Sequence, residues 1–471
     1  MKKTKITKMI LGLTGAILAA GSVQAQTATT TTASPVLNQT NAVSLVTNGA
    51  GTAAPGGNLW GYVFGDYAYM QHGDSAGRGT KMQYKGLGAA GNQQTSNPNA
   101  FEVRRAYLGY NYNINSKFAA YALLAYEGDY DVNNNRTVYL KYIYFKWKNI
   151  FKGSDLKIGQ QATNSFANAY NTEPLLGYRS IEKTIMDMHG IDGSSDMGIA
   201  LEGKIVKFKC ADTTKLPTFI GYSAMVGDNS ANTPVPVFTG AGTAPNFTTD
   251  KNKKYRANVY VNTLNGALTV GGYIDYLNYG DNLYNTNKNF VPTNSTSSHH
   301  AEAVQTMKAY AVYNSQWFGL GFEVFSQTMT NGELEAWAPG KGINDTVNAK
   351  QSGFSIFAHA TIIQNKLNIF ARYDLYTPDN EYSNTANETF TSAMTNIASI
   401  GNTYNKVPST VAGNTYKEKF VTAGLDWSPT SDKRVHFMPN IWYYGIDNGF
   451  GSDEKKSDSY MVYRLTFLCA F

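Results

Sequence analysis

The chain is short of the residues on which disulfide scaffolds and metal sites depend. It has two cysteines in 471 residues, Cys210 and Cys469, which excludes a disulfide scaffold by count. Cys210 lies beside the predicted strand 195–208 and Cys469 on the predicted strand 458–471, far apart around the sheet, so we expect two free thiols. The six histidines include the pair His299-His300, which has no third ligand at a suitable spacing. The sequence therefore predicts no metal site and no cofactor.

Sequence motifs of enzymes are also lacking. Neither a nucleophile elbow nor a zincin motif occurs in the chain. The segment Gly86-Leu-Gly-Ala-Ala-Gly91 fits the pattern G-x-G-x-x-G, but it lies in a predicted outer loop. A dinucleotide site needs this pattern between a buried strand and a helix. We therefore predict that the protein is not an enzyme.

Long apolar runs and an excess of charge are absent beyond the first 25 residues. No later stretch reaches the ~18 continuous apolar residues that a transmembrane helix needs. The formal net charge is +6, but four of the 40 basic residues lie before residue 26. The remaining 36 basic and 34 acidic residues give +2, which is no argument for nucleic-acid binding.

The first 25 residues have the layout of a secretory signal peptide. Four lysines lie between positions 2 and 8, residues 9–20 are apolar, and Val23-Gln24-Ala25 is a small-x-small cleavage site. We expect cleavage after Ala25 and export of the chain. Residues 26–58 are low in complexity, rich in Thr, Ala and Gly, and predict a periplasmic leader without a core.

Residues 59–471 predict an all-β domain, a transmembrane β-barrel of about 16 antiparallel strands. The chain has 33 Tyr, 23 Phe and 6 Trp, and segments of about ten residues alternate apolar with polar side chains. In 459–471, for example, one face is apolar throughout and the other includes Arg464. The predicted strands are 59–70, 101–112, 117–127, 137–147, 155–161, 195–208, 218–227, 254–262, 267–279, 304–313, 317–327, 352–362, 366–376, 418–427, 434–446 and 458–471.

The connections between these strands alternate in length. Short joins such as 113–116 and 364–365 are followed by long ones such as 71–100 and 377–417. Outer-membrane barrels have short periplasmic turns and long outer loops, and an even strand number places both termini on the periplasmic side. Aromatic residues beside the short joins predict a girdle at the periplasmic interface. They are Tyr112, Phe118, Trp147, Phe151, Phe208, Trp317, Phe318, Trp427, Phe437 and Phe471.

Charged side chains are expected on the inner face of this barrel. A lysine or arginine facing lipid at the membrane midplane costs about 2–4 kcal/mol, so charges flanked by outward apolar residues belong inside. The predicted lumen residues include Arg105, Lys157, Arg256, Arg372, Asp374 and Arg464. An interior with this many charges is too polar to be a dry core, which predicts a water-filled channel. Positive and negative residues occur in nearly equal number, so their count alone predicts no strong selectivity for either sign of ion.

The third long loop, 162–194, differs from the other loops by its apolar residues. Folded into the barrel, these residues could pack against the wall and narrow the channel. Arg179, Glu182 and Lys183 would then line the constriction, together with Asp187 and His189. A packed extracellular lid is the alternative for this loop.

Two stretches resemble the phosphate-selective porin O and P family of bacterial outer-membrane porins. The first is Phe101-Glu-Val-Arg-Arg-Ala-Tyr-Leu-Gly-Tyr110, and the second is Lys157-Ile-Gly-Gln160 followed by Glu173 and 178–183. The resemblance implies a homotrimeric channel, anion-selective in some members, with Arg104 and Arg105 in the lumen and Arg179 and Lys183 near the constriction. The balanced lumen charge departs from that family's pattern.

Together these observations predict an outer-membrane porin for passive diffusion of small hydrophilic solutes and ions, with a preference for anions such as phosphate. Its expected partners are outer-membrane lipid, these solutes and two further copies of the chain, and no nucleic acid. A barrel enzyme, such as a lipase or protease, and a structural or adhesive barrel remain alternatives.

Overall fold

A computed structural model describes residues 55–71, 99–128, 136–165, 183–208, 218–228, 253–280, 302–335, 345–377, 416–430, 432–448 and 458–471. The chain divides into a short unit, Met1–Ser34, of which no residue is described, and a main unit, Pro35–Phe471. The predicted signal peptide, most of the predicted leader and Cys210 lie outside the described residues. Cys469 is a free, exposed thiol.

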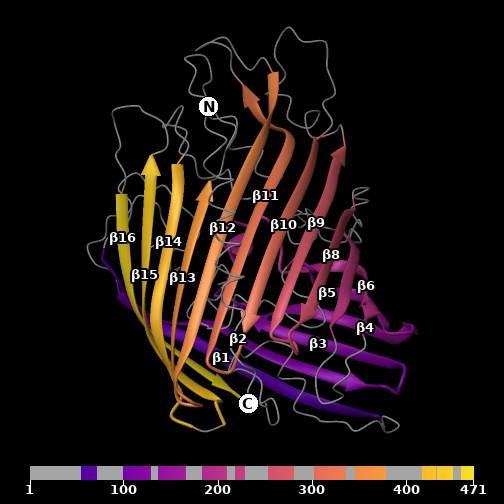
Figure 1. Cartoon of the computed structure of the whole chain (residues 1–471), viewed down its shortest axis with the longest axis horizontal. Helices are drawn as coiled ribbons and strands as arrows, with labels where there is room; N and C mark the ends of the chain where they lie inside the picture. The colour runs from indigo at the N-terminus through magenta and orange to yellow at the C-terminus, as the bar shows by residue number, and fades with distance from the viewer. Residues whose placement is uncertain are drawn as a thin grey trace, which may run out of the picture. The chain divides into compact units, whose positions relative to one another are not determined.

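The main unit is a closed antiparallel barrel of sixteen strands that follow one another around the ring in chain order (Figure 1). This confirms the predicted fold class. The strands are β1 (Gly56–Met70), β2 (Asn99–Asn113), β3 (Phe118–Tyr126), β4 (Tyr139–Phe151), β5 (Ser154–Ala162), β6 (Ser195–Lys207), β7 (Phe219–Gly227), β8 (Lys254–Thr263), β9 (Leu268–Gly280), β10 (Glu302–Asn314), β11 (Phe318–Glu335), β12 (Asp345–Ile363), β13 (Leu367–Thr377), β14 (Tyr416–Trp427), β15 (Val435–Asn448) and β16 (Asp458–Ala470).

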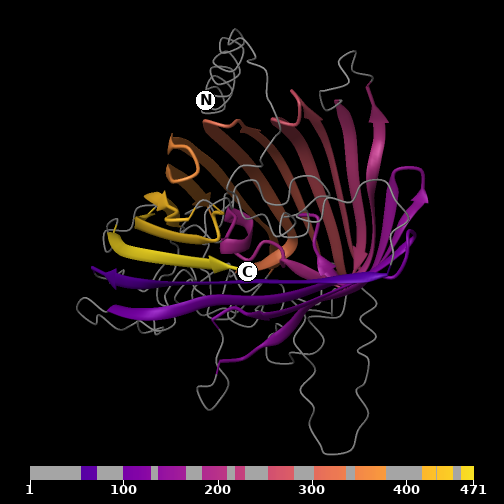
Figure 2. The same cartoon turned by 90° about the horizontal axis from the view of Figure 1, so that it is seen from below.

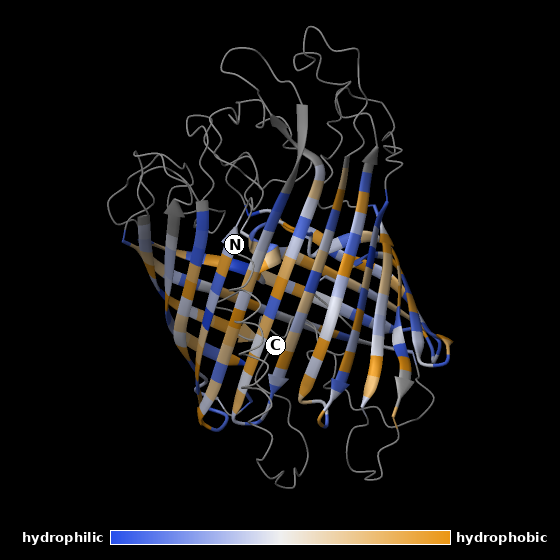
Figure 3. Cartoon of the chain, turned by 45° about the horizontal axis from the view of Figure 1, so that its top comes forward, coloured by the Kyte–Doolittle hydropathy of each residue, from blue (hydrophilic) through white to orange (hydrophobic). Residues whose placement is uncertain are grey.

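The residue pattern of β8 shows why these segments form strands of a barrel. Arg256 and Asn258 are buried, whereas Val259 and Val261, which follow them at the alternate positions, are exposed. Successive side chains of a strand point to opposite faces, so polar residues here face the interior and apolar residues the exterior. Figure 3 shows the same alternation of hydrophilic and hydrophobic residues along strand after strand. We call the side with the buried polar residues the inner face.

The largest error in the predicted strand lengths concerns β11 and β12. The sequence predicted 317–327 and 352–362, but the hairpin continues until Glu335 pairs with Asp345. A register shift between Met329 and Glu333 lies at Asn331-Gly332. This dipeptide is a common turn signal, but here the chain passes it within a strand.

The aromatic residues beside the short turns lie on the outside of the barrel. Most of those predicted for the girdle have exposed side chains, namely Tyr112, Trp147, Phe151, Phe208, Trp317, Phe318, Trp427, Phe437 and Phe471. Phe118 packs against Trp147 with ring centroids 5.5 Å apart. The barrel therefore carries an outward aromatic band at its short-turn end.

Backbone pairing between the first and last strands closes the ring. β1 pairs with β16 from Tyr62↔Ala470 to Met70↔Val462. Beyond the strand, the amide of Phe471 donates to the carbonyl of Gly61 at 2.9 Å, and the amide of Gly61 donates to the carbonyl of Phe471 at 3.1 Å. The described residues contain no helix that is long and apolar enough to cross a membrane.

Candidate functional site on the inner face

The structure places the predicted lumen residues that it describes on the inner face or beside it. Those on strands are Arg104, Arg105, Lys157, Arg256, Arg372, Asp374 and Arg464. Lys183 lies in the segment 183–194, which precedes β6. Arg179 and Glu182 lie outside the described residues. Each described cation of this set has a carboxylate within 4.0 Å.

Asp66 on β1 is the centre of an ion network beside the β1–β16 seam. Its carboxylate accepts hydrogen bonds from Arg464 at 2.6 Å, from Arg104 at 3.2 Å and from the hydroxyl of Thr466. The Arg464 guanidinium lies 3.7 Å from the ring centroid of Trp442, a cation–π contact. Asp66 and Trp442 both have 0% solvent exposure, so the centre of this network is shielded from water.

A β-bulge explains why both arginines of β2 lie near the interior. Along the β1–β2 pair, Phe64 is opposite Arg105 but Gly65 is opposite Val103, which leaves Arg104 as the extra residue. Strict alternation had favoured Arg105 over Arg104 as a lumen residue. The bulge removes that distinction, because it interrupts the alternation between the two positions.

Glu127, directly after β3, collects a second network. Lys141 and Tyr139 donate to its carboxylate, as does the hydroxyl of Tyr107, and Arg105 lies at 3.7 Å. Burial raises the pKa of Glu127. The charges of Lys141 and Arg105 and the hydrogen bonds lower the pKa by more than burial raises it, so it lies well below its usual range. Glu127 therefore stays charged at neutral pH.

Asp192 connects the segment 183–194 to β8. It accepts from Lys254 at 2.8 Å, from Arg256 at 3.0 and 3.1 Å, and from Tyr273 at 3.2 Å. Arg256 also donates to Asp196 at 2.7 Å. Burial raises the pKa of Asp192, and the two cations lower it by more, so the net shift is downward. The segment is thus fixed by buried ion pairs at this end.

Arg372 on β13 holds the other end of the same segment. It makes two hydrogen bonds to Asp374, at 2.8 and 2.6 Å, which fixes its guanidinium plane. The same group donates to the backbone carbonyl of Lys183 and contacts the sulfur of Met188 at 3.3 Å. Arg372 therefore orients the segment through backbone and side-chain contacts.

The segment 183–194 lies inside the ring of strands, as Figure 2 shows. It contains the one-turn helix α2 (Ile185–Met188), whose N-cap Thr184 accepts from the amide of Asp187 at 3.2 Å. His189 stacks on Tyr376 with ring centroids 3.6 Å apart. The segment's buried apolar residues pack on inner-face aromatic residues of β9, β11, β13, β14 and β15, namely Tyr273, Phe325, Tyr376, Phe420, Trp442 and Tyr444.

The described ends of the predicted third loop thus contact the inner wall from β8 to β16. At the other end, the carbonyls of Asn164 and Ser165 accept hydrogen bonds from Asn258 and Lys308. Residues 166–182 lie outside the described residues, so these contacts concern 163–165 and 183–194 alone.

A different ion cluster occupies the inner face of β4–β6. Lys157 binds Glu202 at 2.6 Å, and Lys146 binds Asp155 at 2.8 Å and Glu202 at 3.5 Å. The side chains of Lys146, Lys157 and Asp155 are 19, 20 and 28% exposed. The Asp66, Asp192 and Arg372 networks have most of their side chains below 5%. Water therefore reaches this cluster more readily than it reaches those three.

Sequence reasoning missed several of these inner-face residues, although a signal was available for some. Lys146 alternates with outward aromatic residues, and Asp155 and Lys254 have the same strand parity as Lys157 and Arg256. Asp192 follows no strand period, so alternation had no means of finding it. Among the described residues, no group of three or more His, Cys, Asp or Glu side chains is placed to hold a metal ion.

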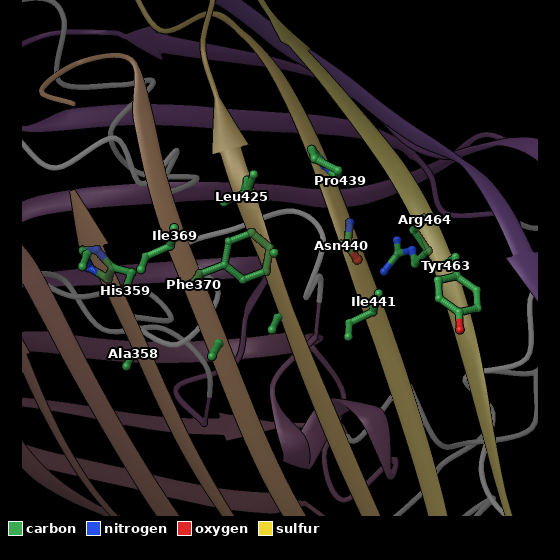
Figure 4. A pocket seen from close by; sticks show the side chains of 14 residues that line it. Ala358, His359, Ile369, Phe370, Leu425, Pro439, Asn440, Ile441, Tyr463 and Arg464 are labelled. Atoms are coloured by element: carbon green, nitrogen blue, oxygen red, sulfur yellow. The ribbon is translucent and has the colours of Figure 1, made fainter. Parts of the chain in front are cut away.

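The outer face carries an apolar groove of about 820 Å³ across β12–β16 (Figure 4). Small residues such as Ala358 and Ala371 form its floor, between larger side chains such as Ile369, Leu425 and Tyr463. These larger side chains are exposed, so the groove belongs to the outside of the barrel and not to its interior.

No family model matches the chain, and no curated protein matches its sequence. Among solved structures, an anion-selective porin from Comamonas acidovorans is similar, with a TM-score of 0.50, 11% identity, and coverage of 89% of this chain and 100% of that chain. The outer membrane channel DcaP of Acinetobacter baumannii has a TM-score of 0.49 and 13% identity, and the match covers 89% of this chain and 98% of that chain. OprB of Pseudomonas putida has a TM-score of 0.47 and 13% identity, with 88% and 94% covered. At such identities, the first of these similarities supports the barrel fold alone.

Proposed function

We propose that the protein is an outer-membrane porin through which small hydrophilic solutes and ions diffuse passively. The distribution of side chains between the two faces of the barrel carries this proposal. Large apolar residues such as Ile199, Val259 and Leu465 are exposed on the outside, and charged networks lie on the inside. An extended apolar exterior requires a partner that excludes water, and a lipid bilayer is such a partner for a closed barrel.

The short-turn end of the barrel would face the periplasm. The outward aromatic band lies at this end, and aromatic rings concentrate where lipid meets water. Both ends of the described barrel, at Gly56 and Ala470, also lie at the short-turn end. Export through a signal peptide cleaved after Ala25 agrees with this placement and remains part of the proposal.

A preference for anions such as phosphate is the finer part of the proposal, and we expect it to be weak. The predicted lumen cations are paired with carboxylates, for example Arg105 with Glu127 at 3.7 Å and Arg464 with Asp66 at 2.6 Å. A paired arginine attracts a passing anion less than an isolated one, because the carboxylate opposes its field. On the family resemblance alone, we also propose a homotrimer.

Reconstitution in planar bilayers tests the proposed channel. Purified protein should produce stepwise ion conductance, and a salt gradient should give a small reversal potential of the anion-selective sign. Glu127→Gln should raise the anion preference, because it leaves Arg105 and Lys141 without their carboxylate. The exposed Asp432→Asn variant serves as the control. Absence of conductance from folded, inserted protein would refute the proposed channel. A strong preference for cations would refute the proposed anion preference.

A further inference from the structure

The segment 183–194 divides the inner wall of the barrel into a covered part and an open part. It packs on side chains of β8 to β16, and it is held there by Arg256 and Arg372. The side-chain contacts given above for this segment do not reach the inner faces of β3 to β6. Within the part of the chain that the structure describes, the segment therefore leaves the wall formed by these four strands uncovered.

This open wall carries a row of hydrogen-bonding groups. Tyr121 on β3 and Tyr144 on β4 stack with ring centroids 4.8 Å apart and an interplanar angle of 10°. The ammonium of Lys157 lies 5.7 Å from the centroid of Tyr144. The row continues through the cluster on β4–β6 and consists of Tyr121, Tyr144, Lys146, Asp155, Lys157 and Glu202. We call it the β3–β6 row.

The β3–β6 row combines zero net charge with a high hydrogen-bonding capacity. Its two lysines are neutralised by Asp155 and Glu202 at 2.6 to 2.8 Å. An ammonium has three donors, and a carboxylate has about four acceptor positions, so ion pairing leaves several of them available. A free ion or a zwitterion would have to displace an existing partner. A hydroxyl group can donate to a carboxylate and accept from an ammonium without breaking the pair.

We propose that the β3–β6 row is a binding subsite for neutral polyhydroxylated solutes, that is, for small saccharides in transit. This inference rests on the proposed channel function and names its solute class. The stacked phenol rings add two hydroxyl groups to the row and a rigid surface beside it. The zero net charge of the row means that its polar groups favour neither sign of ion.

Two further lysines lie on the same wall, nearer the short turns. Lys148 donates to the side chain of Asn113 at 2.6 Å, and the ammonium of Lys204 lies 4.3 Å from the ring centroid of Phe219. They add positive charge beside the row and favour anions at that depth. The experiment must therefore separate saccharide binding from anion attraction.

Liposome swelling with the full-length protein measures the preference. Ribose and glutamine have similar size, but one is a neutral polyol and the other a zwitterion. Ribose should enter faster than glutamine through the wild-type channel. The double variant Tyr121→Phe/Tyr144→Phe should reduce this ratio by about three- to tenfold, as expected for the loss of one or two hydrogen bonds. Ion conductance should remain close to that of the wild type.

Two further variants sharpen the result. Lys157→Leu/Glu202→Leu removes one neutral pair of the row, so the ribose preference should fall. Tyr255→Phe/Tyr276→Phe is the matched control, because these paired tyrosines are exposed on the outer face. It should retain the wild-type ratio.

The outcomes separate this inference from the proposed function. Equal rates for ribose and glutamine, faster glutamine, or an unchanged ratio in both inner-face variants would overturn the saccharide subsite while the channel stands. Competition of ribose entry by inorganic phosphate would also overturn it, since the row would then hold anions. A folded protein that passes no solute and no current would refute the proposed channel itself.

Discussion

Asp66 illustrates the energetics of a single charge inside this barrel. Its carboxylate is fully buried, and two arginines and a threonine donate to it. Burying a charge is unfavourable, but attraction and hydrogen bonds offset the desolvation as long as all partners are present. Removing one member therefore destabilises the fold by more than the complete network stabilises it, because the remaining charges stay without full compensation.

We predict that Asp66→Asn lowers the free energy of unfolding by about 3–5 kcal/mol, the range for breaking a buried ion pair. The amide cannot neutralise the buried Arg464 or the partly buried Arg104. Urea unfolding of the protein in detergent, followed by tryptophan fluorescence, measures the change. Asp432→Asn removes a carboxylate whose side chain is 58% exposed and should leave the stability close to that of the wild type. Equal stability of the two variants would contradict the role given to Asp66.

Glu127 gives a pH-dependent prediction. Its pKa is below the usual range in the folded barrel, because Lys141 and Arg105 outweigh the effect of burial. A depressed folded-state pKa contributes stability above the unfolded-state pKa, and this contribution is lost as the pH falls through the folded-state value. The stability difference between wild type and Glu127→Gln should thus be constant from pH 8 to pH 6 and shrink under strong acid. Unfolding at several pH values checks this, and a difference that grows below pH 4 would contradict it.

Alternation predicts an inner-face residue only where the strand is regular. Outward apolar residues flank Arg256, Arg372 and Asp374 at period two, which predicts that they point inward, and all three are buried. Lys141 was missed, since a register shift lies beside it between Leu123 and Leu124. Strand period also says nothing of which carboxylate neutralises which cation, because partners such as Asp66 and Arg464 are 398 residues apart.

At the scale of elements, the segment 183–194 packs against the inner face of the barrel. It is attached by ion pairs at Asp192 and by Arg372 at the other end. Packing of Ile185 and Met186 on aromatic side chains adds apolar contact. Because the two polar attachments lie on β8 and β13, loss of either frees one end of the segment.

We predict that Asp192→Asn and Arg372→Met each increase single-channel conductance and admit larger solutes. In either variant the segment loses charge-assisted bonds and moves away from its wall for part of the time. Bilayer recordings and swelling assays with solutes of increasing size measure both effects. Lys366→Met, in the exposed turn before β13, is the control and should behave as wild type. A conductance below the wild-type value in both variants would contradict this role of the segment.

The strands themselves could largely be predicted from the sequence, and their ends less well. Each of the sixteen strands could be found from its own period-two pattern between turn residues, but the ends of β11 and β12 were missed, because their hairpin continues past the turn-like Asn331-Gly332 of β11. The conformation of 183–194 could not be predicted in this way. Its position depends on contacts with distant strands, and no local pattern encodes these contacts.

At the scale of the whole molecule, closure of the ring is the condition for every inner-face network. An open sheet would expose the unpaired backbone groups of two edge strands, and none of these groups can be left unpaired in lipid. β16 prevents this because it pairs with β15 on one side and with β1 on the other. It also supplies Arg464 and Thr466 to the Asp66 network.

We therefore predict that removal of residues 458–471 abolishes folding into the membrane. The shortened chain would leave β1 and β15 as open edges, and Asp66 would lose its hydrogen bonds from Arg464 and Thr466. Heat-modifiable migration on gels and protease protection in liposomes report the folded barrel, and both should be lost. A chain that lacks residues 26–54 keeps every described contact and should retain both properties. Equal folding of the two truncated chains would show that closure by β16 is not required.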